Sequence, residues 1–406
     1  MNVKGPRLLW FVVVVLITIA IPFFACKAQA QKEPIKIGIC LDQTGFIAFA
    51  GIEGIKGIQL GLEDLFPGGE FNGRPVKLII EDAASDAGPS MDKMKKLVER
   101  DKVCLVMGPI NGGGSQATFH YLNTVNIPRL DIQPADIPHD FDRTKPYVQF
   151  SVHGSSMSMA YTMGAYAYEK LGYKTAVVHT ADFIAGYLFT GGFKKGFEDR
   201  GGKVLQEVFY PPGTNDQTPY FIKLQQADCM CAWWPGHDGL VAFPQYKSLG
   251  IKMPIVQPED GGLTASPPAL KELGANAVGC VTAGLYSYML DTPKNKAFVE
   301  KYKKKFNEIP GPFSGAGYAN MEVLLAALKA TKGDTSSAAL KKAIRGLKID
   351  TLTGPVEFTQ SNNQVSTCTP MILKINEKYE PIVVNLPVVI ETWPSKEVTK
   401  YNIKWR

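Results

Sequence analysis

The chain has 406 residues, of which 45% are hydrophobic and 20% are charged, with 39 glycines and 28 prolines. This composition is typical of a globular protein and excludes intrinsic disorder, collagen and coiled coil, and the length fits two domains that each bury their own core. The formal net charge of +6 is too small and too evenly spread along the chain to indicate a nucleic-acid partner.

Residues 1–30 have the pattern of a secretory signal peptide. Two basic residues precede an apolar run over residues 8–25, and the small residues of Ala28-Gln29-Ala30 precede a cleavage site. An uncleaved membrane anchor is one alternative, because a run of this length just spans a bilayer, and lipid attachment at Cys26 is another. We expect an exported protein whose remainder is soluble.

Six cysteines follow the signal sequence, and five of them lie in or beside apolar runs that are typical of strands. We expect buried free thiols that pack as small hydrophobic side chains. Cys229 and Cys231 would share one face of a strand, but no second pair of Cys or His has the spacing of a metal site. The even number also leaves a disulfide framework open. The six are Cys40, Cys104, Cys229, Cys231, Cys280 and Cys368.

From residue 35 onward, short apolar runs alternate with amphipathic stretches. In the first half, strands are predicted over 35–40, 76–82, 103–109 and 127–132, and helices over 54–65, 90–101 and 115–123. After residue 152 the pattern restarts, with helices over 156–171, 186–200, 220–226 and 239–249 and strands over 175–180, 202–210, 228–234, 253–259 and 279–284. This alternation predicts βαβ units and parallel sheets.

The last third of the chain departs from this alternation. Helices are predicted over 294–307, 319–332 and 336–347, and strands only afterwards, over 356–359, 370–375 and 381–385. We expect these helices to join the first lobe and these strands the second. The fold class is therefore α/β, with two doubly wound parallel-sheet lobes joined by a multi-crossing hinge. The expected lobes comprise 31–149 with 284–350, and 150–283 with 351–406.

The glycine-rich segment Gly108–Ser115 follows a predicted strand and opens a helix. It resembles a phosphate-binding loop, but Gly114 stands where that motif needs lysine, so a nucleoside triphosphatase is not expected. Free backbone N–H groups at a helix N-terminus still bind anions, and Ser115 adds a hydroxyl donor. We predict a carboxylate site from Gly113, Gly114, Ser115 and Gln116; a glycine-rich turn with a serine cap is the alternative.

Further candidates follow predicted strands, where open α/β sheets bind ligands. They are Gln133, Ala135, Asp136, Phe183, Trp233, Trp234, Glu259 and Asp260. Of the two consecutive tryptophans, we expect one in the core and one as a flat apolar platform in the cleft. The five histidines are scattered, and no motif of nucleophilic or metal-dependent catalysis occurs, so we expect a binding protein without cofactor or metal and not an enzyme.

The chain resembles the periplasmic solute-binding proteins of branched-chain amino-acid-type ABC transporters, the leucine/isoleucine/valine-binding family. The similarity recurs in order over nearly the whole chain beyond residue 31. The segments that carry it are 35–65, 71–98, 181–204, 244–256, 317–330 and 351–359. The resemblance implies a type I periplasmic binding fold, a hinge that closes on a small solute, and a membrane permease as partner.

The resemblance also implies roles for single residues. The ligand's carboxylate would be held at Gly113–Gln116, with Ser115 as hydroxyl donor, and a second patch at Gln133–Asp136 has Ala135-Asp136 where the family has Ala-Thr. Phe183 replaces a tyrosine of the family, and Glu259 or Asp260 would hold the ligand's ammonium. The family's first-lobe disulfide is missing, because Ser85 and the region of Asn111 and Gly112 replace both cysteines.

Two classes of ligand remain open. The acid at Glu259 or Asp260 favours a branched-chain or related amino acid, whereas Trp233, Trp234 and the loss of tyrosine favour a flat aromatic or other carboxylic acid. A sensory protein of the same fold is an alternative to the transport protein, and an exported enzyme with unrecognised chemistry is a third hypothesis.

Overall fold

The structure is a computed structural model that describes residues 1, 32–134, 147–259, 263–358, 365–368, 370–392 and 400–404. The predicted signal peptide, Cys26, Ala135, Asp136 and Asp260 lie outside these residues. Among the residues that the structure describes, no helix is both long and apolar enough to cross a membrane.

The first lobe is built on a mostly parallel sheet in the order β2-β3-β1-β4-β5-β6. Its strands are β1 (Ile35–Leu41), β2 (Glu70–Phe71), β3 (Arg74–Asp82), β4 (Leu105–Met107), β5 (Arg129–Asp131) and β6 (Gln149–Ser151), and only β2 runs antiparallel to its neighbour. Helices cover both faces because alternate residues of β1 are apolar and buried on opposite sides. One face carries α1 (Ala48–Leu65), α10 (Pro312–Ala330) and α11 (Ser337–Ile344), and the other carries α2 (Ala87–Lys95), a π-helical turn (Lys96–Arg100) and α3 (Gly112–Val125). A short 3-10 turn, Pro67–Gly69, follows α1.

The second lobe repeats this plan with the order β8-β7-β9-β10-β11-β15-β16. Its parallel strands are β7 (Thr175–Ala181), β8 (Lys203–Tyr210), β9 (Cys229–Trp233), β10 (Ile255–Gln257) and β11 (Val281–Gly284), and β15 (Met371–Ile375) and β16 (Pro381–Asn385) add antiparallel strands. The helices are α4 (Ser156–Glu169), α5 (Ile184–Glu198), α6 (Thr218–Phe221), α7 (His237–Ser248) and α8 (Pro267–Leu273), followed by a 3-10 turn, Gly274–Ala277. Cys229 and Cys231 belong to one core cluster and Met230 to another, so the two cysteines do share a face.

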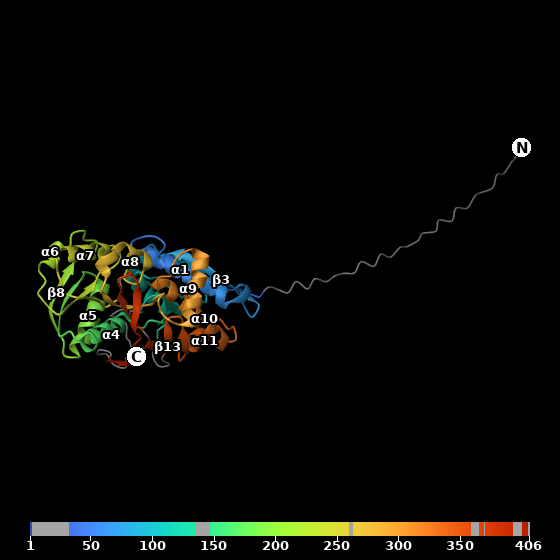
Figure 1. The fold of residues 1–406 in the computed structure, drawn as a ribbon. Helices are drawn as coiled ribbons and strands as arrows, with labels where there is room; N and C mark the ends of the chain where they lie inside the picture. The colour runs from blue at the N-terminus through green and yellow to red at the C-terminus, as the bar shows by residue number, and fades with distance from the viewer. Residues whose placement is uncertain are drawn as a thin grey trace.

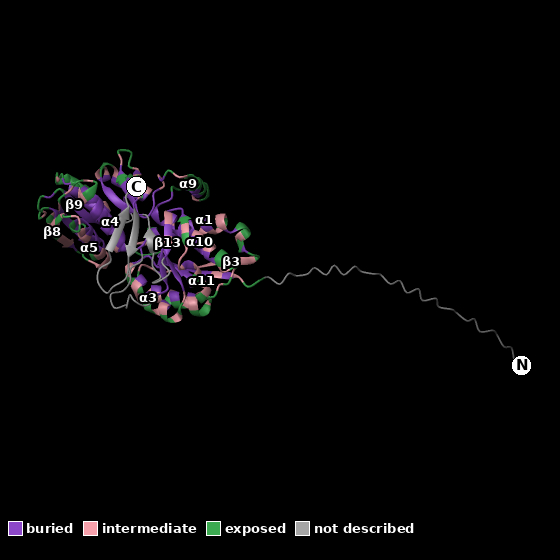
Figure 2. Ribbon diagram, turned by 90° about the horizontal axis from the view of Figure 1, so that it is seen from below, coloured by how far each residue is buried: buried purple, intermediate pink, exposed green. Residues whose placement is uncertain are grey.

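The chain crosses between the lobes after β6, after β11 and again before β15. Helices α9 (Pro293–Phe306), α10 and α11 therefore lie beside the N-terminal elements of the first lobe, as Figure 1 shows by their orange colour next to blue α1 and β3. Buried residues line the inner sides of these helices and the strands between them, and exposed residues follow the outer helix faces (Figure 2). The described part of the chain thus has the predicted two-lobed α/β architecture.

The C-terminal strands differ from the prediction in one respect. The segments 370–375 and 381–385 join the second sheet as expected, but 356–359 does not. A separate antiparallel sheet contains β12 (Lys348–Thr351), β13 (Gly354–Phe358), β14 (Val365–Cys368), β17 (Val388–Thr392) and β18 (Lys400–Lys404). A tight turn between Thr351 and Gly354 pairs β13 with β12. Because β13 forms its hydrogen bonds with this local partner, that edge of the strand is not available to the sheet of the second lobe.

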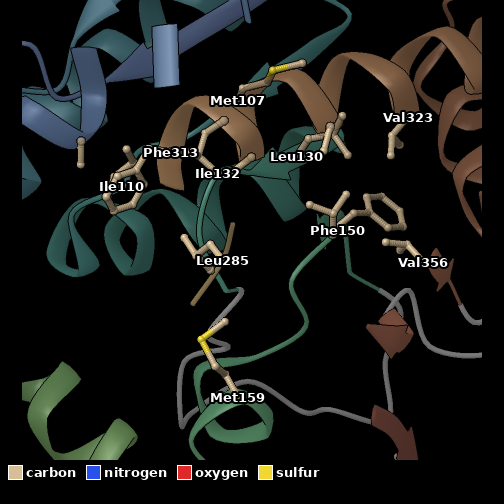
Figure 3. Close-up of a cluster of buried hydrophobic side chains, with 14 of the residues drawn as sticks. Met107, Ile110, Leu130, Ile132, Phe150, Met159, Leu285, Phe313, Val323 and Val356 are labelled. Carbon is tan, nitrogen blue, oxygen red and sulfur yellow. The ribbon is translucent and has the colours of Figure 1, made fainter. Parts of the chain in front are cut away.

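The cores of the two lobes are continuous through the hinge. Phe313 of α10 lies beside Ile110 and Ile132, and Leu130 and Phe150 of the first sheet lie toward Val323 and Val356 (Figure 3). The same buried cluster includes Leu285 and Met159 of α4. The crossing segments are therefore anchored by apolar side chains at both ends.

Close helix pairs explain the glycine-rich sequences of α1 and α10. A β-carbon at Gly57 of α1 would collide with the carbonyl oxygen of Ser314, and one at Gly317 of α10 would collide with the carbonyl oxygen of Gly54. Helix α10 therefore starts at Pro312, seven residues before the prediction, because its glycines serve close approach and not chain termination. Helix α8 was not predicted; it begins with Pro267 and Pro268, and proline is tolerated in a first helical turn.

We predict that Gly57→Ala lowers the free energy of unfolding by about 1–3 kcal/mol, because the added methyl group forces α1 and α10 apart. Gly191→Ala in α5 is the matched control, since nothing lies within 4 Å of its β-carbon position. That control should be neutral or stabilise by up to about 1 kcal/mol through helix propensity. Urea denaturation of both variants measures the difference, and equal effects would contradict the packing argument.

Candidate ligand-binding site

A cleft lies between the carboxyl ends of the two parallel sheets. Each sheet reverses its strand order there, beside β1 and β4 in the first lobe and beside β7 and β9 in the second, and such switch points are where open α/β sheets bind ligands. The space between the walls of the cleft is about 890 Å³, part of which is open to solvent. The first lobe contributes Phe46, Ile47, Phe49, Ile110, Asn111, Gly112, Ser115, Gln116, Gln133, Pro134 and Phe313. The second lobe contributes Ser156, Phe183, Ile184, Ala185, Leu188, Phe189, Trp233, Pro235, Glu259 and Leu285.

On the first-lobe side, the buried carboxylate of Asp42 holds the loops that follow β3 and β4. Its Oδ1 accepts hydrogen bonds from the backbone N–H of Ser85 at 2.8 Å and from Nδ2 of Asn111 at 2.7 Å. Its Oδ2 accepts from the backbone N–H groups of Ile110 and Asn111, both at 3.1 Å. The two loops are thereby fixed relative to β1.

Asn111 is the N-cap of α3, and its side-chain oxygen accepts from the backbone N–H of Gly114. Ser115 donates its own backbone N–H to the Asn111 carbonyl at 2.9 Å. The N–H groups of Gly112 and Gly113, in the first turn, have no partner within the helix, as at any helix start. The backbone of Gly112 and the hydroxyl-bearing Ser115 both line the cleft, so this wall presents donors and the positive end of the helix dipole.

A buried arginine lies directly behind this wall. Arg129 of β5 is only 1% exposed; its Nη2 donates to Ser115 Oγ at 3.0 Å and its Nη1 to the Ser115 carbonyl at 3.1 Å. Nη1 also donates to Thr118 Oγ1 at 3.0 Å. Asp131, two residues further along the same strand face, lies 3.0 Å from Arg129 Nε and is equally buried.

On the second-lobe side, the wall carries a buried carboxylate set among aromatic rings. Glu259 is 6% exposed and its Oε2 accepts from Trp233 Nε1 at 2.8 Å. The Trp233 ring stacks on Phe189 at 5.3 Å between centroids and lies 5.2 Å from Phe183. The carboxylate is therefore held in position by a ring that is itself fixed by packing.

Apolar side chains of the two lobes approach each other closely at the cleft. Phe49 packs edge-on against Phe313 with centroids 6.1 Å apart. Its ring also lies 3.9 Å from the β-carbon position of Gly236 in the second lobe, and Ile184 lies at the same distance from that of Gly112. The cleft walls are thus close enough for one small ligand to contact both.

The structure brings six of the predicted residues to the cleft. They are Ser115, Gln116, Gln133, Phe183, Trp233 and Glu259. Gly113 and Gly114 do not line it: the α-carbon of Gly114 packs against Ser90, and the helix turns Gly113 away from the cavity. Ala135, Asp136 and Asp260 lie outside the described residues.

Trp234 was also predicted as a binding residue, and the structure puts it in the core instead. It is completely buried, and its Nε1 donates to His179 Nδ1 at 2.8 Å. The His179 ring lies between Phe221 and Tyr210, with centroids 4.4 and 5.1 Å away. Alternate residues of a strand point to opposite faces, so when Trp233 faces the cleft its neighbour faces away.

Sequence reasoning missed Arg129, Phe46, Phe49 and Phe313. Arg129 lies inside the apolar run 127–132, where a charged residue within a predicted central strand was the available signal. The three phenylalanines lie at or near helix starts, and nothing in the sequence distinguishes them from core residues. Among the described residues, no group of three or more His, Cys, Asp or Glu side chains gathers as a metal site.

Comparisons with known proteins agree with this fold. The family model of the periplasmic binding proteins matches residues 34–378. Leu/Ile/Val-binding protein homolog 6 of Brucella suis is 25% identical over 356 residues, which are 85% of this chain and 88% of that protein. An ABC transporter substrate-binding protein from Sphaerobacter thermophilus superposes with a TM-score of 0.80 at 29% identity, over 87% of this chain and 97% of that one. A solute-binding protein of an ABC transporter from R. palustris, in complex with benzoate, superposes with a TM-score of 0.77 at 21% identity, over 87% and 96% of the two chains.

The two tryptophans give a matched test of the cleft wall. Trp234→Ala should lower the free energy of unfolding by about 3–5 kcal/mol, because it empties a core position and leaves His179 without its donor. Trp233→Ala should cost less stability but weaken ligand binding by about 2 kcal/mol, because it removes a cleft surface and the donor to Glu259. Thermal unfolding and calorimetric titration separate the effects. If Trp234→Ala folds well and loses affinity while Trp233→Ala keeps it, the assignment of Trp233 to the cleft and Trp234 to the core is wrong.

A second prediction concerns pH. Burial lowers the pKa of His179 to about 3 and that of His153, in the hinge, also to about 3. An unfolded chain protonates histidine near pH 6.5, so between pH 6.5 and 3 the unfolded state binds more protons than the folded state. The free energy of unfolding should therefore fall as the pH drops through this window.

Replacing one imidazole by a side chain that does not titrate tests this sign. Urea denaturation of His179→Gln at pH 7.5 and pH 5 should give a smaller difference than in the wild type, and His153→Gln should do the same. Lower stability at pH 7.5 with an unchanged difference between the two pH values would show that the imidazole pKa is not depressed.

Proposed function

We propose that this protein binds an amino acid with an apolar side chain. The chain belongs to the periplasmic binding proteins, the substrate-binding components of ABC transporters, which bind solutes and are not enzymes. We also propose that residues 1–30 direct its export and that a membrane permease receives the solute. Lipid attachment at Cys26 is the alternative to a freely diffusing protein.

The observation that carries the amino-acid proposal is the pair of opposite poles in the cleft. The α3 N-terminus with Ser115 offers donors to a carboxylate. Glu259, buried on the other lobe, offers a carboxylate to an ammonium group. A zwitterion bridging the lobes would satisfy both poles at once.

The apolar lining supports a hydrophobic side chain on that ligand. Phe46, Phe49 and Phe313 of the first lobe line the cleft, with Phe183, Phe189 and Leu285 of the second lobe. Such a surface favours a branched aliphatic or aromatic side chain over a polar one.

An aromatic carboxylic acid is the second candidate, since the aromatic lining suits a flat ring and the neighbour from R. palustris binds benzoate. Glu259 argues against an aromatic acid as the ligand. A ligand with a carboxylate and no ammonium would leave this buried negative charge facing the ligand without a cation of the ligand's own.

Binding across the cleft would favour the closed arrangement of the lobes. A ligand shifts such an equilibrium only by its preference for the closed state, and a zwitterion held by both walls has that preference. The closed form is then what a permease recognises. A sensory protein would use the same closure to deliver a signal, and the chain's own residues do not distinguish the two roles.

Glu259→Gln tests the choice of ligand. Protein freed of ligand by unfolding and refolding is titrated with leucine, isoleucine, valine, phenylalanine and benzoate. For the wild type we expect binding of one or more of the amino acids. Glu259→Gln should weaken that binding by about 10- to 100-fold, because a charge-assisted hydrogen bond to the ammonium is lost.

Glu272→Gln, on an exposed position of α8 in the same lobe, is the control and should leave affinity unchanged. Binding of benzoate alone, unaffected by or improved in Glu259→Gln, would overturn the amino-acid proposal and favour the aromatic acid.

A further inference from the structure

Arg129 is arranged toward the cleft in an unusual way. It does not line the cavity and is 1% exposed, so it cannot touch a ligand directly. Yet three of its four polar contacts go to the first turns of α3, and two of these go to Ser115, the hydroxyl-bearing residue of the donor wall.

Helix stability does not account for this position. The N-terminal end of a helix carries partial positive charge, so a cation there is unfavourable, and burial of a guanidinium is costly by itself. Asp131 at 3.0 Å offsets part of that cost. An apolar residue facing α3 from β5 would avoid the cost entirely, so the arginine calls for another explanation.

The hydrogen bond from Arg129 to Ser115 Oγ offers an explanation for the buried arginine. A serine hydroxyl is both a donor and an acceptor and normally rotates to suit either kind of partner. Here a guanidinium N–H already donates to Oγ at 3.0 Å, so the oxygen serves as acceptor toward the protein interior and its hydrogen must point elsewhere. Within the described residues, the Ser115 hydroxyl donates no hydrogen bond of its own, and the residue lines the cleft.

We propose that Arg129 is a positioning residue that fixes the Ser115 hydroxyl as a donor into the cleft, so that the site selects a carboxylate over a neutral amide. Hydrogen bonding from a cation also polarises the hydroxyl and strengthens its donation. A hydroxyl free to rotate would accept from the NH₂ group of an amide as readily as it donates to a carboxylate. In Ser115 the guanidinium occupies one of the two lone pairs of Oγ and directs the hydrogen away from itself, so the hydroxyl donates to a carboxylate more readily than it accepts from an amide.

The inference rests on the proposed function, because it requires a ligand carboxylate at the α3 wall. The measurement is the ratio of dissociation constants for leucine and leucinamide, which share the ammonium and the side chain and differ only at the carboxyl group. If the wild type binds isoleucine, valine or phenylalanine in place of leucine, the pair becomes that amino acid and its amide. If the wild type prefers benzoate, the pair becomes benzoate and benzamide.

Arg129→Lys retains the charge but not the planar fork that reaches Ser115 Oγ, Ser115 O and Thr118 together. We expect it to lower the preference for carboxylate over amide about tenfold. Ser115→Ala should lower the preference by as much, and adding Arg129→Lys to Ser115→Ala should change it no further, since the arginine acts through that hydroxyl.

Thr118→Val is the matched control for a purely structural role. It removes another partner of Arg129 Nη1 and should lower stability while leaving the ratio unchanged. If Arg129→Lys does not fold, the carboxylate-to-amide ratios of Ser115→Ala and Thr118→Val are compared instead. A ratio that Ser115→Ala leaves unchanged overturns the proposal. A wild type that binds none of leucine, isoleucine, valine, phenylalanine and benzoate overturns the proposed function and this inference together. A wild type that binds, with a ratio unaffected by Arg129→Lys, overturns only this inference.

Discussion

The first-lobe wall of the cleft depends on one buried carboxylate. Asp42 follows β1 and accepts four hydrogen bonds from the loops after β3 and β4, so one side chain ties both loops to the end of that strand. Through Asn111 it sets the cap of α3, and through that cap it sets where Ser115 faces. Helix α1 approaches so closely that no side chain fits at Gly51, whose β-carbon would overlap the Asp42 backbone. The carboxylate thus joins strand, helix and loops at the switch point of the sheet.

This tie also stands where the resemblance to the binding-protein family implies a disulfide. In the two regions where the resemblance implies these cysteines, the backbone N–H of Ser85 and the side-chain amide of Asn111 both donate to Asp42. The five cysteines whose side chains the structure describes are free, and four of them are fully buried. Hydrogen bonds to a desolvated carboxylate are strong. Several of them keep the loops after β3 and β4 close together without a covalent link, and packing and charge then determine the relative position of these loops.

The sequence predicts the architecture better than the site. Alternating strands and helices follow from local periodicity, which any βαβ unit must show, so both sheets could be inferred in advance. The cleft residues that were predicted lie at or beyond the carboxyl ends of strands, where topology alone brings side chains together: Ser115, Gln116, Gln133, Phe183, Trp233 and Glu259. The position of Arg129 behind Ser115 depends on how α3 packs against β5, which the periodicity of the sequence does not specify. The role of Phe49 depends on the apposition of two lobes, which no local pattern encodes.

The glycine-lined helix pairs have a mechanical consequence. Each lobe contains one pair in near backbone contact, α1 with α10 and α4 with α5, where Gly164 and Gly196 admit carbonyl oxygens of the partner helix. Backbones in such contact have no compressible side-chain layer between them, so neither lobe can absorb strain by sliding these helices. Each lobe therefore behaves as a stiff lever, and the work that a ligand does in drawing the walls together is delivered almost undiminished to the connecting segments after β6 and β11.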